Sequence, residues 1–308
     1  MKKRELPDEL MFLRNSKAQQ KTSSATMENK VVVITGATSG VGLESIKQLA
    51  KGKATIVMVA RNINKAEEVR KSVQSEYPTN IDIVLADFSV LRQVRSAAEI
   101  ILEKYPRIDV LINCAGLHST KATYTADGFE TVFMVNHLAS FLFTQLLLER
   151  LKQSAPSRIL HINSEGHRFN GLNIDDIHWK KRHYTGLRGY GASKTAQLLT
   201  MWEMADQLKD TGVTINAMHP GDVRSSIGSN NGWLYRLFSK LVIQPMLKSP
   251  RISGEAIYYL VADPQMADVS GKFFHLTIEE KPAKHAMDRT LGKQVYKLSM
   301  ELTDCFKE

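Results

Sequence analysis

The hydrophobic and polar positions along most of the chain follow two alternating periods. Short runs of β-branched and other apolar residues indicate buried strands, whereas apolar residues spaced three and four apart indicate amphipathic helices. Strands are predicted over residues 31–35, 55–60, 81–86, 110–113, 158–163, 213–218 and 272–276. Helices are predicted between them, over about residues 41–51, 65–75, 91–104, 127–153 (as one helix or two) and 190–209.

Strands that are separated by helices require crossover connections, which give a parallel sheet covered on both faces. The pattern therefore predicts a doubly wound Rossmann fold of the α/β class, with about seven strands, predominantly parallel. Ligands of such a fold bind past the carboxyl ends of the strands. No internal repeat interrupts the pattern, so residues 27–308 are predicted to form one domain. Residues 1–26 are predicted to be a basic leader that is mobile, packed on the domain surface or in contact with a membrane surface.

The composition gives more information about the compartment and the partners of the protein than about its fold. The net charge of +9 suits a phosphorylated cofactor, an anionic membrane surface or nucleic acid. The chain has no zinc-finger spacing and no RNA-binding aromatic signature, so nucleic acid is not predicted as a partner. Cys114 and Cys305 lie far apart and form no disulfide framework, which indicates a reducing intracellular compartment, cytoplasmic or peripheral to a membrane. The longest apolar stretch, residues 138–148, contains polar residues and is predicted to be a buried helix.

A glycine-rich turn follows the first predicted strand and precedes a helical pattern. Its glycines have the spacing G-x-x-x-G-x-G. A helix start offers unpaired N–H groups and the positive end of the helix dipole, and glycine lets a phosphate approach the backbone. Glycines in turns also serve structure alone, so the turn by itself is only compatible with a diphosphate site. Its candidate cofactor-binding residues are Gly36, Thr38, Ser39, Gly40, Val41 and Gly42.

The ends of the second and third predicted strands carry candidate nucleotide-binding residues. Arg61 lies 19 residues after Gly42, where an acidic residue would bind the ribose hydroxyl of NAD. A guanidinium suits a 2′-phosphate instead, so the sequence predicts NADP(H) rather than NAD(H), with Asn62 beside the arginine. A surface arginine at a strand end is the alternative. Asp87 is predicted to accept the adenine amino group, and Phe88 to flank the ring.

Candidate catalytic residues follow the fifth predicted strand and begin the predicted helix over residues 190–209. Tyr190 and Lys194 share a helix face because they are four residues apart. The ammonium stabilises a phenolate and is expected to lower the tyrosine pKa from its usual ~10. Such a tyrosine exchanges a proton with an oxygen undergoing hydride transfer, and Ser164 is placed to hydrogen-bond the same oxygen. A Y-x-x-x-K pair alone is common and carries little information.

Together these residues resemble the short-chain dehydrogenase/reductase family, and within it the retinol dehydrogenase-like branch. The resemblance extends from residue 29 to about residue 305. Cys114 and Asn163 depart from the residues usual in this branch, which affects fine geometry and not the reaction class. The resemblance rests on seven blocks in the family's order: residues 35–42 (TGATSGVG), Asp87, residues 113–116 (NCAG), residues 136–138 (NHL), Ser164, Tyr190 with Lys194, and residues 219–221 (HPG).

The resemblance implies a role for each matching residue. Tyr190 would be the acid/base and Ser164 would orient the carbonyl. Lys194 would lower the tyrosine pKa and hold the nicotinamide ribose, and Asn136 would anchor a water in the proton relay. The cofactor-binding set would further include Asn113, Ala115, Gly116, Pro220, Gly221 and Val223.

Two stretches are predicted to select the substrate. The long connection between Ser164 and Tyr190 is expected to rim the substrate entrance. Residues 222–250 form a predicted substrate loop, whose apolar face around Trp233 and Phe238 favours a lipophilic substrate; core packing and membrane contact are the alternatives. Four histidines in or near the connection have spacings that fit no ordinary ligand pattern, so no metal site is predicted. They are His161, His167, His178 and His183.

The predicted function is NADP(H)-dependent hydride transfer between the nicotinamide and the carbonyl or alcohol carbon of a lipophilic small molecule. Two alternatives stay open: reduction of a conjugated C=C bond, and a non-catalytic cofactor-binding scaffold on the same fold. The intact catalytic residues argue against a scaffold, since a retired enzyme need not keep them. A homo-oligomer and peripheral membrane contact are further open expectations.

Overall fold

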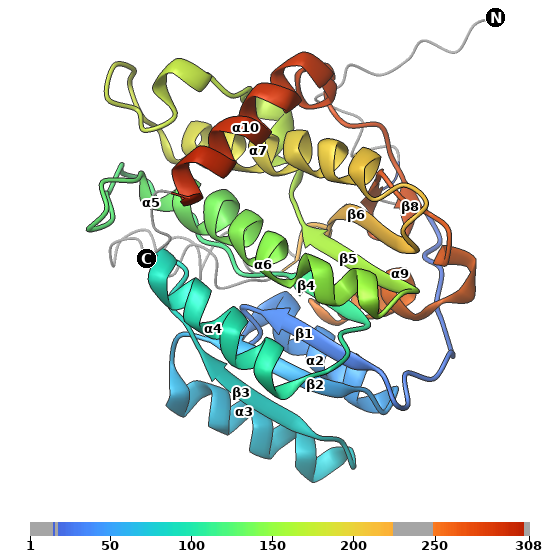
Figure 1. Cartoon of the computed structure of the whole chain (residues 1–308). Coiled ribbons are helices and arrows are strands. Elements are labelled where there is room, and N and C mark those ends of the chain that lie inside the picture. The colour runs from blue at the N-terminus through green and yellow to red at the C-terminus, as the bar shows by residue number, and fades with distance from the viewer. Residues whose placement is uncertain (1–14, 16–17, 224–248, 305–308) are drawn as a thin grey trace, which may run out of the picture.

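The computed structural model describes residue 15, residues 18–223 and residues 249–304 of the chain. An eight-stranded sheet runs through this part in the order β3-β2-β1-β4-β5-β6-β7-β8 (Figure 1). Neighbouring strands are parallel except for the last pair, β7 and β8. The strands are β1 (Val31–Thr35), β2 (Thr55–Ala60), β3 (Ile81–Leu85), β4 (Val110–Asn113), β5 (Ser157–Ile162), β6 (Val213–His219), β7 (Lys272–His275) and β8 (Ile278–Glu279).

Helices cover both faces of this sheet. The α-helices are α2 (Gly40–Lys51), α3 (Ile63–Glu76), α4 (Leu91–Lys104), α5 (Thr131–Phe133), α6 (Ala139–Gln153), α7 (Gly186–Gln207), α9 (Arg251–Ala262) and α10 (Arg289–Asp304). A π-helical segment, η2 (Met134–Leu138), joins α5 to α6. Short 3₁₀ helices are η3 (Glu165–Phe169), η4 (Ile174–Asp176), η7 (Pro264–Met266) and η8 (Lys284–Met287).

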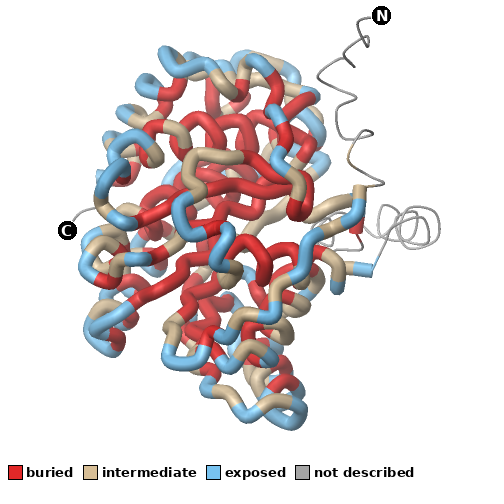
Figure 2. The backbone as a smooth tube through the Cα atoms, turned by 90° about the vertical axis from the view of Figure 1, so that its right-hand side faces the viewer, coloured by how far each residue is buried: buried red, intermediate tan, exposed pale blue. Residues whose placement is uncertain are grey.

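Successive strand residues point to opposite faces and so divide the core in two. Val33 packs into the cluster under α4, α6, α7 and α10, whereas Val32 and Ile34 pack into the cluster under α2, α3 and α9. Figure 2 shows the buried residues concentrated in the strands and on the inner sides of the helices. Because the strands are buried on both faces, their sequences are nearly continuous apolar runs. This burial on both faces confirms the predicted doubly wound fold.

The structure corrects the sequence prediction at several element ends. The seven predicted strands are present with small shifts at their ends, but β8, α9 and α10 were not predicted. Helix α7 begins at Gly186 because the Thr185 side chain caps it by accepting the Arg188 N–H. Tyr190 therefore lies inside the helix and not at its head.

The apolar helix is longer than the stretch that the sequence singled out. It runs from Thr131 to Gln153, and by length and a mean hydropathy of 1.5 it is the one described helix that could cross a membrane. However, 78% of its apolar window is buried within the protein. This burial is what a core helix of a Rossmann fold requires.

Part of the predicted leader lies on the sheet edge at β7 and β8. The Gln20 side chain accepts the Thr277 N–H at 3.0 Å, and the Lys21 N–H donates to the Thr277 hydroxyl at 2.8 Å. Further along, the Tyr258 hydroxyl of α9 donates to the Ala25 carbonyl. Residues 20–25 are thus attached to the domain surface by hydrogen bonds.

Candidate active site

The glycine-rich turn packs directly against the loop that follows β4. Gly36 has φ +68°, and a Cβ added there would lie 2.6 Å from Ala115 Cα. A Cβ on Gly42 would lie 2.6 Å from the Gly36 carbonyl oxygen. The Thr35 hydroxyl accepts the N–H groups of Cys114 and Ala115 at 3.0 and 2.9 Å, which holds the two loops together. Only glycine fits this approach, so the backbone of the turn can lie against a ligand.

Helix α2 starts in this turn without a side-chain cap. Ser39 occupies the N-cap position, yet its side chain makes no cap hydrogen bond, and the first turn contains no acidic residue. The first N–H groups of a helix need a partner and lie at the positive end of the helix dipole. The turn therefore fits a bound diphosphate, as the sequence predicted for Thr38, Ser39, Gly40 and Val41.

The predicted adenosine-binding residues of two strands meet at the ends of β2 and β3. Arg61 Nη1 lies 4.0 Å from Asp87 Oδ2, and 64% of the arginine side chain is exposed. Asp87 Oδ1 accepts both the N–H and the hydroxyl of Ser89, which fixes the carboxylate. The exposed guanidinium can bind a phosphate, and the fixed carboxylate can accept an amino group.

The side-chain positions correct the prediction for Phe88. Its ring is buried in the core with its centroid 5.6 Å from that of Phe143, so the ring does not flank an adenine site. Asn62 caps α3, because its side-chain oxygen accepts the Lys65 N–H at 3.0 Å. Asn62 is exposed beside Arg61, and its contact with the cofactor stays a prediction.

The loop after β4 carries one buried side chain and several small residues. The Asn113 side chain donates to the Thr144 hydroxyl at 2.8 Å and ties β4 to α6, so it serves packing. Ala115 contacts the glycine-rich turn through its backbone, as described above, and Gly116 follows it. In the structure this loop lies against the glycine-rich turn, and its contact with a cofactor stays a prediction.

The predicted catalytic residues come together at the end of β5. Ser164 is the N-cap of η3, and its hydroxyl lies in hydrogen-bonding contact with the Tyr190 phenol on α7. Lys194 Nζ lies 5.8 Å from the Tyr190 ring centroid and donates to the Ile162 carbonyl at 2.7 Å. A hydroxyl, a phenol and an ammonium thus share one small region.

The acid–base state of this group differs from the sequence expectation. Burial raises the pKa of Tyr190 to about 12, although the Ser164 hydrogen bond lowers it. Burial also lowers the pKa of Lys194 to about 8. The expected lowering of the tyrosine pKa by Lys194 is absent, and burial of the phenol has the largest influence on its pKa.

Two residues beside Tyr190 were missed by the sequence reasoning. A Cβ added to Gly166 would lie 2.9 Å from Tyr190 Cδ1, so the ring packs on a glycine. The His118 ring makes an edge contact with the Tyr190 ring, with centroids 5.8 Å apart, and burial lowers the pKa of His118. Gly166 could have been predicted from its position two residues after Ser164. No motif near His118 in the sequence indicates that it lies beside Tyr190.

Asn136 fastens the β4 loop to the helix that carries Tyr190. Its side chain accepts the Leu117 N–H at 2.8 Å and donates to the Leu117 carbonyl and the Ser193 hydroxyl, each at 3.0 Å. Its backbone carbonyl accepts from Ser140 and Gln197. The described contacts make Asn136 a positioning residue, while its predicted water contact stays a prediction.

The loop after β6 reaches the same edge of the sheet. Gly221 has φ +79°, and the Pro220 carbonyl accepts the Ser253 hydroxyl at 2.6 Å, which anchors the loop to α9. The Val223 N–H donates to the Gly221 carbonyl at 3.0 Å. Most of the predicted substrate loop, including Trp233 and Phe238, lies outside the described residues.

The family is decided by comparison with known proteins. A family model described as short chain dehydrogenase matches residues 30–232. This chain belongs to the short-chain dehydrogenase family. It is an NAD(P)-dependent dehydrogenase or reductase that transfers a hydride, and it is retinol dehydrogenase-like.

The similarity to curated members of this family covers most of the chain. Human retinol dehydrogenase 13 is 35% identical over 285 residues, which are 91% of this chain and 86% of that protein. Mouse retinol dehydrogenase 14 is 34% identical over 307 residues, which are 96% of this chain and 92% of that protein.

Solved structures support the same fold. An uncharacterised protein of Mycobacterium paratuberculosis superposes with a TM-score of 0.74 at 25% identity, covering 93% of this chain and 98% of that one. A short-chain dehydrogenase of Shigella flexneri, solved in complex with NADP, has a TM-score of 0.65 at 21% identity, covering 82% and 99%.

Proposed function

We propose that this short-chain dehydrogenase uses NADP(H) to reduce or form a carbonyl group on a lipophilic small molecule, with residues 27–308 as one catalytic domain. The contact of the Ser164 hydroxyl with the Tyr190 phenol, next to buried Lys194, carries the proposal. A substrate oxygen that accepts from both hydroxyls would be oriented and protonated at one place. The bound nicotinamide supplies or accepts the hydride.

Tyr190 is proposed as the proton donor to the substrate oxygen. With a pKa of about 12, its phenol keeps its proton at neutral pH, which suits carbonyl reduction. Alcohol oxidation requires the phenol to give up its proton first, and the nearby ammonium of Lys194 would then stabilise the phenolate. The same phenol would therefore serve both directions, as the acid in carbonyl reduction and, once ionised, as the base in alcohol oxidation.

Arg61 is proposed to select NADP(H) over NAD(H). Its exposed guanidinium stands at the end of β2 beside Asp87, where the ribose of a nucleotide held on the glycine-rich turn would lie. The guanidinium would bind the 2′-phosphate, while Asp87 would accept the adenine amino group. The Asp87 carboxylate alone would repel that phosphate, so its pairing with Arg61 supports the preference.

A lipophilic substrate is proposed from the relatives. The curated relatives are named for retinol, an apolar alcohol, and they align with nearly the whole chain. A hydrophobic aldehyde, ketone or alcohol of this kind is therefore the substrate class to test first.

Exchange of Tyr190 for phenylalanine tests the chemistry directly. NADPH oxidation over a panel of lipophilic aldehydes and ketones should fall about 10²–10⁴-fold in kcat for Tyr190→Phe, because a general acid contributes that much. NADPH binding, measured by fluorescence titration, should stay unchanged. Tyr258→Phe removes a hydroxyl that donates to Ala25 on the other face of the sheet, so this control should keep wild-type turnover.

The same panel separates the other functions. Wild-type turnover by Tyr190→Phe would refute the assigned acid. A saturated ketone among the products, identified by mass spectrometry and NMR, would show C=C reduction, and no turnover with either cofactor would indicate a scaffold.

A further inference from the structure

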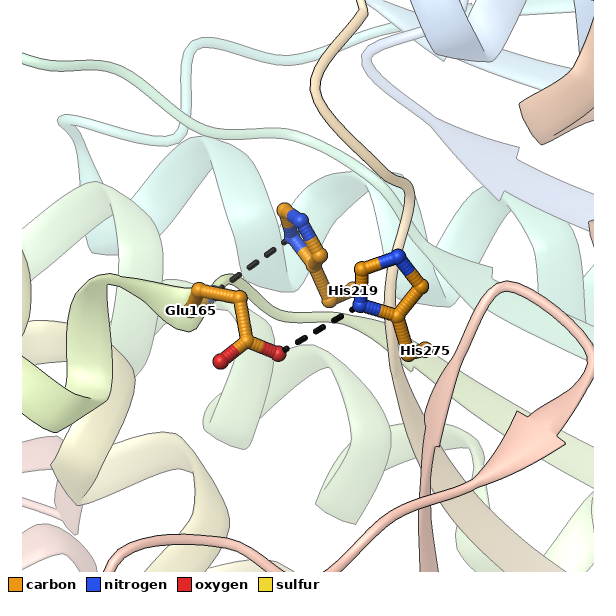
Figure 3. A group of neighbouring side chains, drawn as sticks. All are labelled: Glu165, His219 and His275. Atoms are coloured by element: carbon orange, nitrogen blue, oxygen red, sulfur yellow. Dashed lines mark hydrogen bonds and ion pairs between the residues drawn. The ribbon is translucent and has the colours of Figure 1, made fainter. Parts of the chain in front are cut away.

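Three buried residues converge from the ends of three adjacent strands, beside the catalytic serine. Glu165 follows Ser164 after β5, His219 ends β6 and His275 ends β7 (Figure 3). Their exposures are 7%, 6% and 3%. One donor atom from each lies within 4.8 Å of the others. Parallel neighbouring strands bring these residues together although up to 110 positions separate them in the sequence.

Each of the three residues has a buried polar atom that lacks a hydrogen-bond partner within the described part of the chain. These atoms are Glu165 Oε1, His219 Nε2 and His275 Nδ1. Such an atom costs roughly 1–3 kcal/mol in a protein interior, so three of them in one place need a physical explanation. A shared ligand that accepts electron pairs would satisfy all three.

The spacings suit a common metal ion better than direct hydrogen bonds. His275 Nδ1 lies 3.9 Å from Glu165 Oε1 and 3.8 Å from Glu280 Oε2, beyond hydrogen-bonding distance. A tetrahedral metal ion about 2.1 Å from each of two ligand atoms separates them by roughly 3.4 Å, so a side-chain shift of about 0.5 Å would bring His275 Nδ1 and Glu165 Oε1 onto one ion. His219 completes the set through a ring nitrogen; its Nδ1 has only a long contact, 3.4 Å, from the Glu165 N–H.

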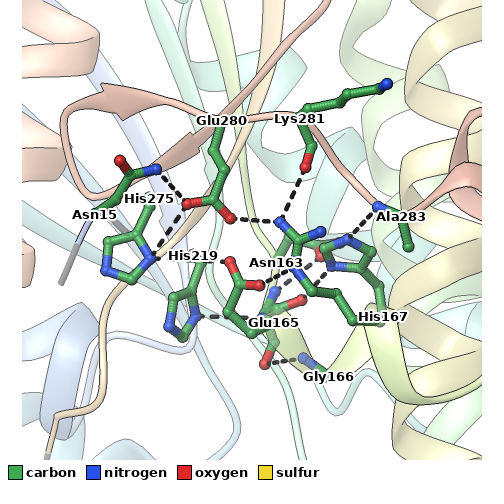
Figure 4. A network of polar contacts seen from close by, with 12 residues as sticks. Asn15, Asn163, Glu165, Gly166, His167, His219, His275, Glu280, Lys281 and Ala283 are labelled. Atoms are coloured by element: carbon green, nitrogen blue, oxygen red, sulfur yellow. Dashed lines mark hydrogen bonds and ion pairs between the residues drawn. The ribbon is translucent and has the colours of Figure 1, made fainter. Parts of the chain in front are cut away.

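Arg168 holds the two carboxylates in place through ion pairs. Its guanidinium, which is fully buried, donates to Glu165 Oε2 and Glu280 Oε1 (Figure 4). One oxygen of each carboxylate is therefore left facing His275, and Asn15 also donates to the Glu280 oxygen at 2.5 Å. Hydrogen bonds of this kind orient metal ligands.

The charge balance also accommodates a cation. Two carboxylates and one guanidinium leave one negative charge when both carboxylates are ionised, and a bound cation would offset it. Neutral imidazoles with a carboxylate are ligands of Zn²⁺ and related transition metals, whereas Mg²⁺ and Ca²⁺ prefer oxygen ligands alone.

We propose that Glu165, His219 and His275 bind a divalent transition-metal ion of the Zn²⁺ type, with the Glu280 carboxylate beside His275 as a neighbouring negative charge. The ion would tie the ends of β5, β6 and β7 together and so hold Ser164 and the Pro220 loop in position. This role is structural and does not depend on the proposed hydride chemistry.

Metal content tests this site without reference to activity. The full chain is purified without a histidine tag, and its metals are measured by plasma mass spectrometry before and after stripping with a chelator. The stripped protein is then titrated with Zn²⁺. We expect about one ion per chain, and Zn²⁺ should raise the Tm of the stripped protein by roughly 5 °C when it is about 100-fold above Kd.

Matched variants locate the ion. His275→Gln and Glu165→Gln should weaken Zn²⁺ binding by at least the 10–100-fold typical of losing an outer-shell partner. His183→Gln, which removes an exposed histidine outside the cluster, should bind like wild type.

A spectroscopic readout keeps the proposal testable if a ligand variant fails to fold. Co²⁺ bound to the wild-type chain should show the visible bands of nitrogen and oxygen ligands, without the intense near-ultraviolet band of a thiolate. A stripped wild-type chain that binds neither Zn²⁺ nor Co²⁺ at micromolar concentration would overturn the proposal. Wild-type affinity in folded His275→Gln would overturn it as well.

Discussion

The carboxyl edge of the sheet has two halves that differ in how they carry polar groups. The first half, around β1, β2 and β3, presents main-chain groups and exposed charges. The second half, around β5, β6 and β7, contains buried charged side chains. The first half offers the glycine-rich turn, the uncapped start of α2 and the exposed Arg61. The second half buries Arg168, Glu165, Glu280 and His275 together. A surface that binds a nucleotide must leave its groups available, whereas buried charges must satisfy one another.

The difference has energetic consequences. A buried charge that loses its partner is left without solvent or counter-charge, so its neighbours are destabilised strongly. An exposed charge is solvated in both states, and its removal changes stability little. We therefore expect the two arginines of these halves to serve different purposes: Arg168 stabilises the fold, and Arg61 has the proposed role in cofactor binding.

The largest expected effect follows from removing the buried arginine. Arg168→Met leaves the carboxylates of Glu165 and Glu280 without their cation, so the free energy of unfolding should fall by about 3–5 kcal/mol. Urea denaturation measures this loss of unfolding free energy. Arg61→Met should change the same quantity by no more than about 0.5 kcal/mol. Equal losses in the two variants would remove the contrast between the halves.

The exposed arginine should matter for the cofactor instead. Arg61→Met removes a charge-assisted contact to the 2′-phosphate and should weaken NADPH binding about 10–100-fold while leaving NADH binding unchanged. Fluorescence titration with NADPH and with NADH measures the two affinities. The control Arg92→Met changes an exposed arginine on α4 and should alter neither affinity. An equal change for the two cofactors would take Arg61 out of the phosphate site.

The loss of stability between pH 7 and pH 5 should come from buried histidines, and all nine histidines lie at residue 118 or later, after β1, β2 and β3. Burial lowers the pKa of His137 from its ordinary 6.5 to about 3. The unfolded chain therefore binds this proton first as the pH falls below 6.5, and the stability that the neutral imidazole contributes is lost toward pH 3. At pH 5 this loss is about 2 kcal/mol for one such group.

Substitution of His137 measures how much this residue contributes to the loss of unfolding free energy at acid pH. His137→Gln should make the fall in unfolding free energy between pH 7 and pH 5 shallower by about that amount, measured by urea denaturation at each pH. His183→Gln, whose side chain is exposed, should leave the slope as it is. An unchanged slope in the His137 variant would assign the acid sensitivity to other groups.

The first half of the site was predictable because its signals are contiguous. The run from Val31 to Gly42 contains the strand, the turn and the helix start, and Arg61 follows at a countable distance. Phe88 shows the limit of this reasoning, since the side chain after a strand can turn into the core. Whether it does so depends on Phe143, which lies 55 residues away.

The second half was predictable only in part. The spacing of Tyr190 and Lys194 and the resemblance to a family pointed to the proposed catalytic group, but not to its acid–base state. The phenol pKa is raised chiefly by burial, and burial is a property of the packed structure. Ligand spacing along the chain cannot detect the cluster of Glu165, His219 and His275, because these residues come from the ends of three strands.

Sequence alone was sufficient for seven of the eight described strands, for most of the described helices, for the glycine-rich turn and for the family, since hydrophobic period and short motifs are local properties of the chain. Tertiary structure decided which of the predicted side chains face the site, how burial shifts their pKa values, and how Arg168 joins two carboxylates from η3 and the chain after β8. The physical reason is that desolvation and ion pairing depend on which residues the fold brings together, and in a parallel sheet those residues are far apart in the sequence.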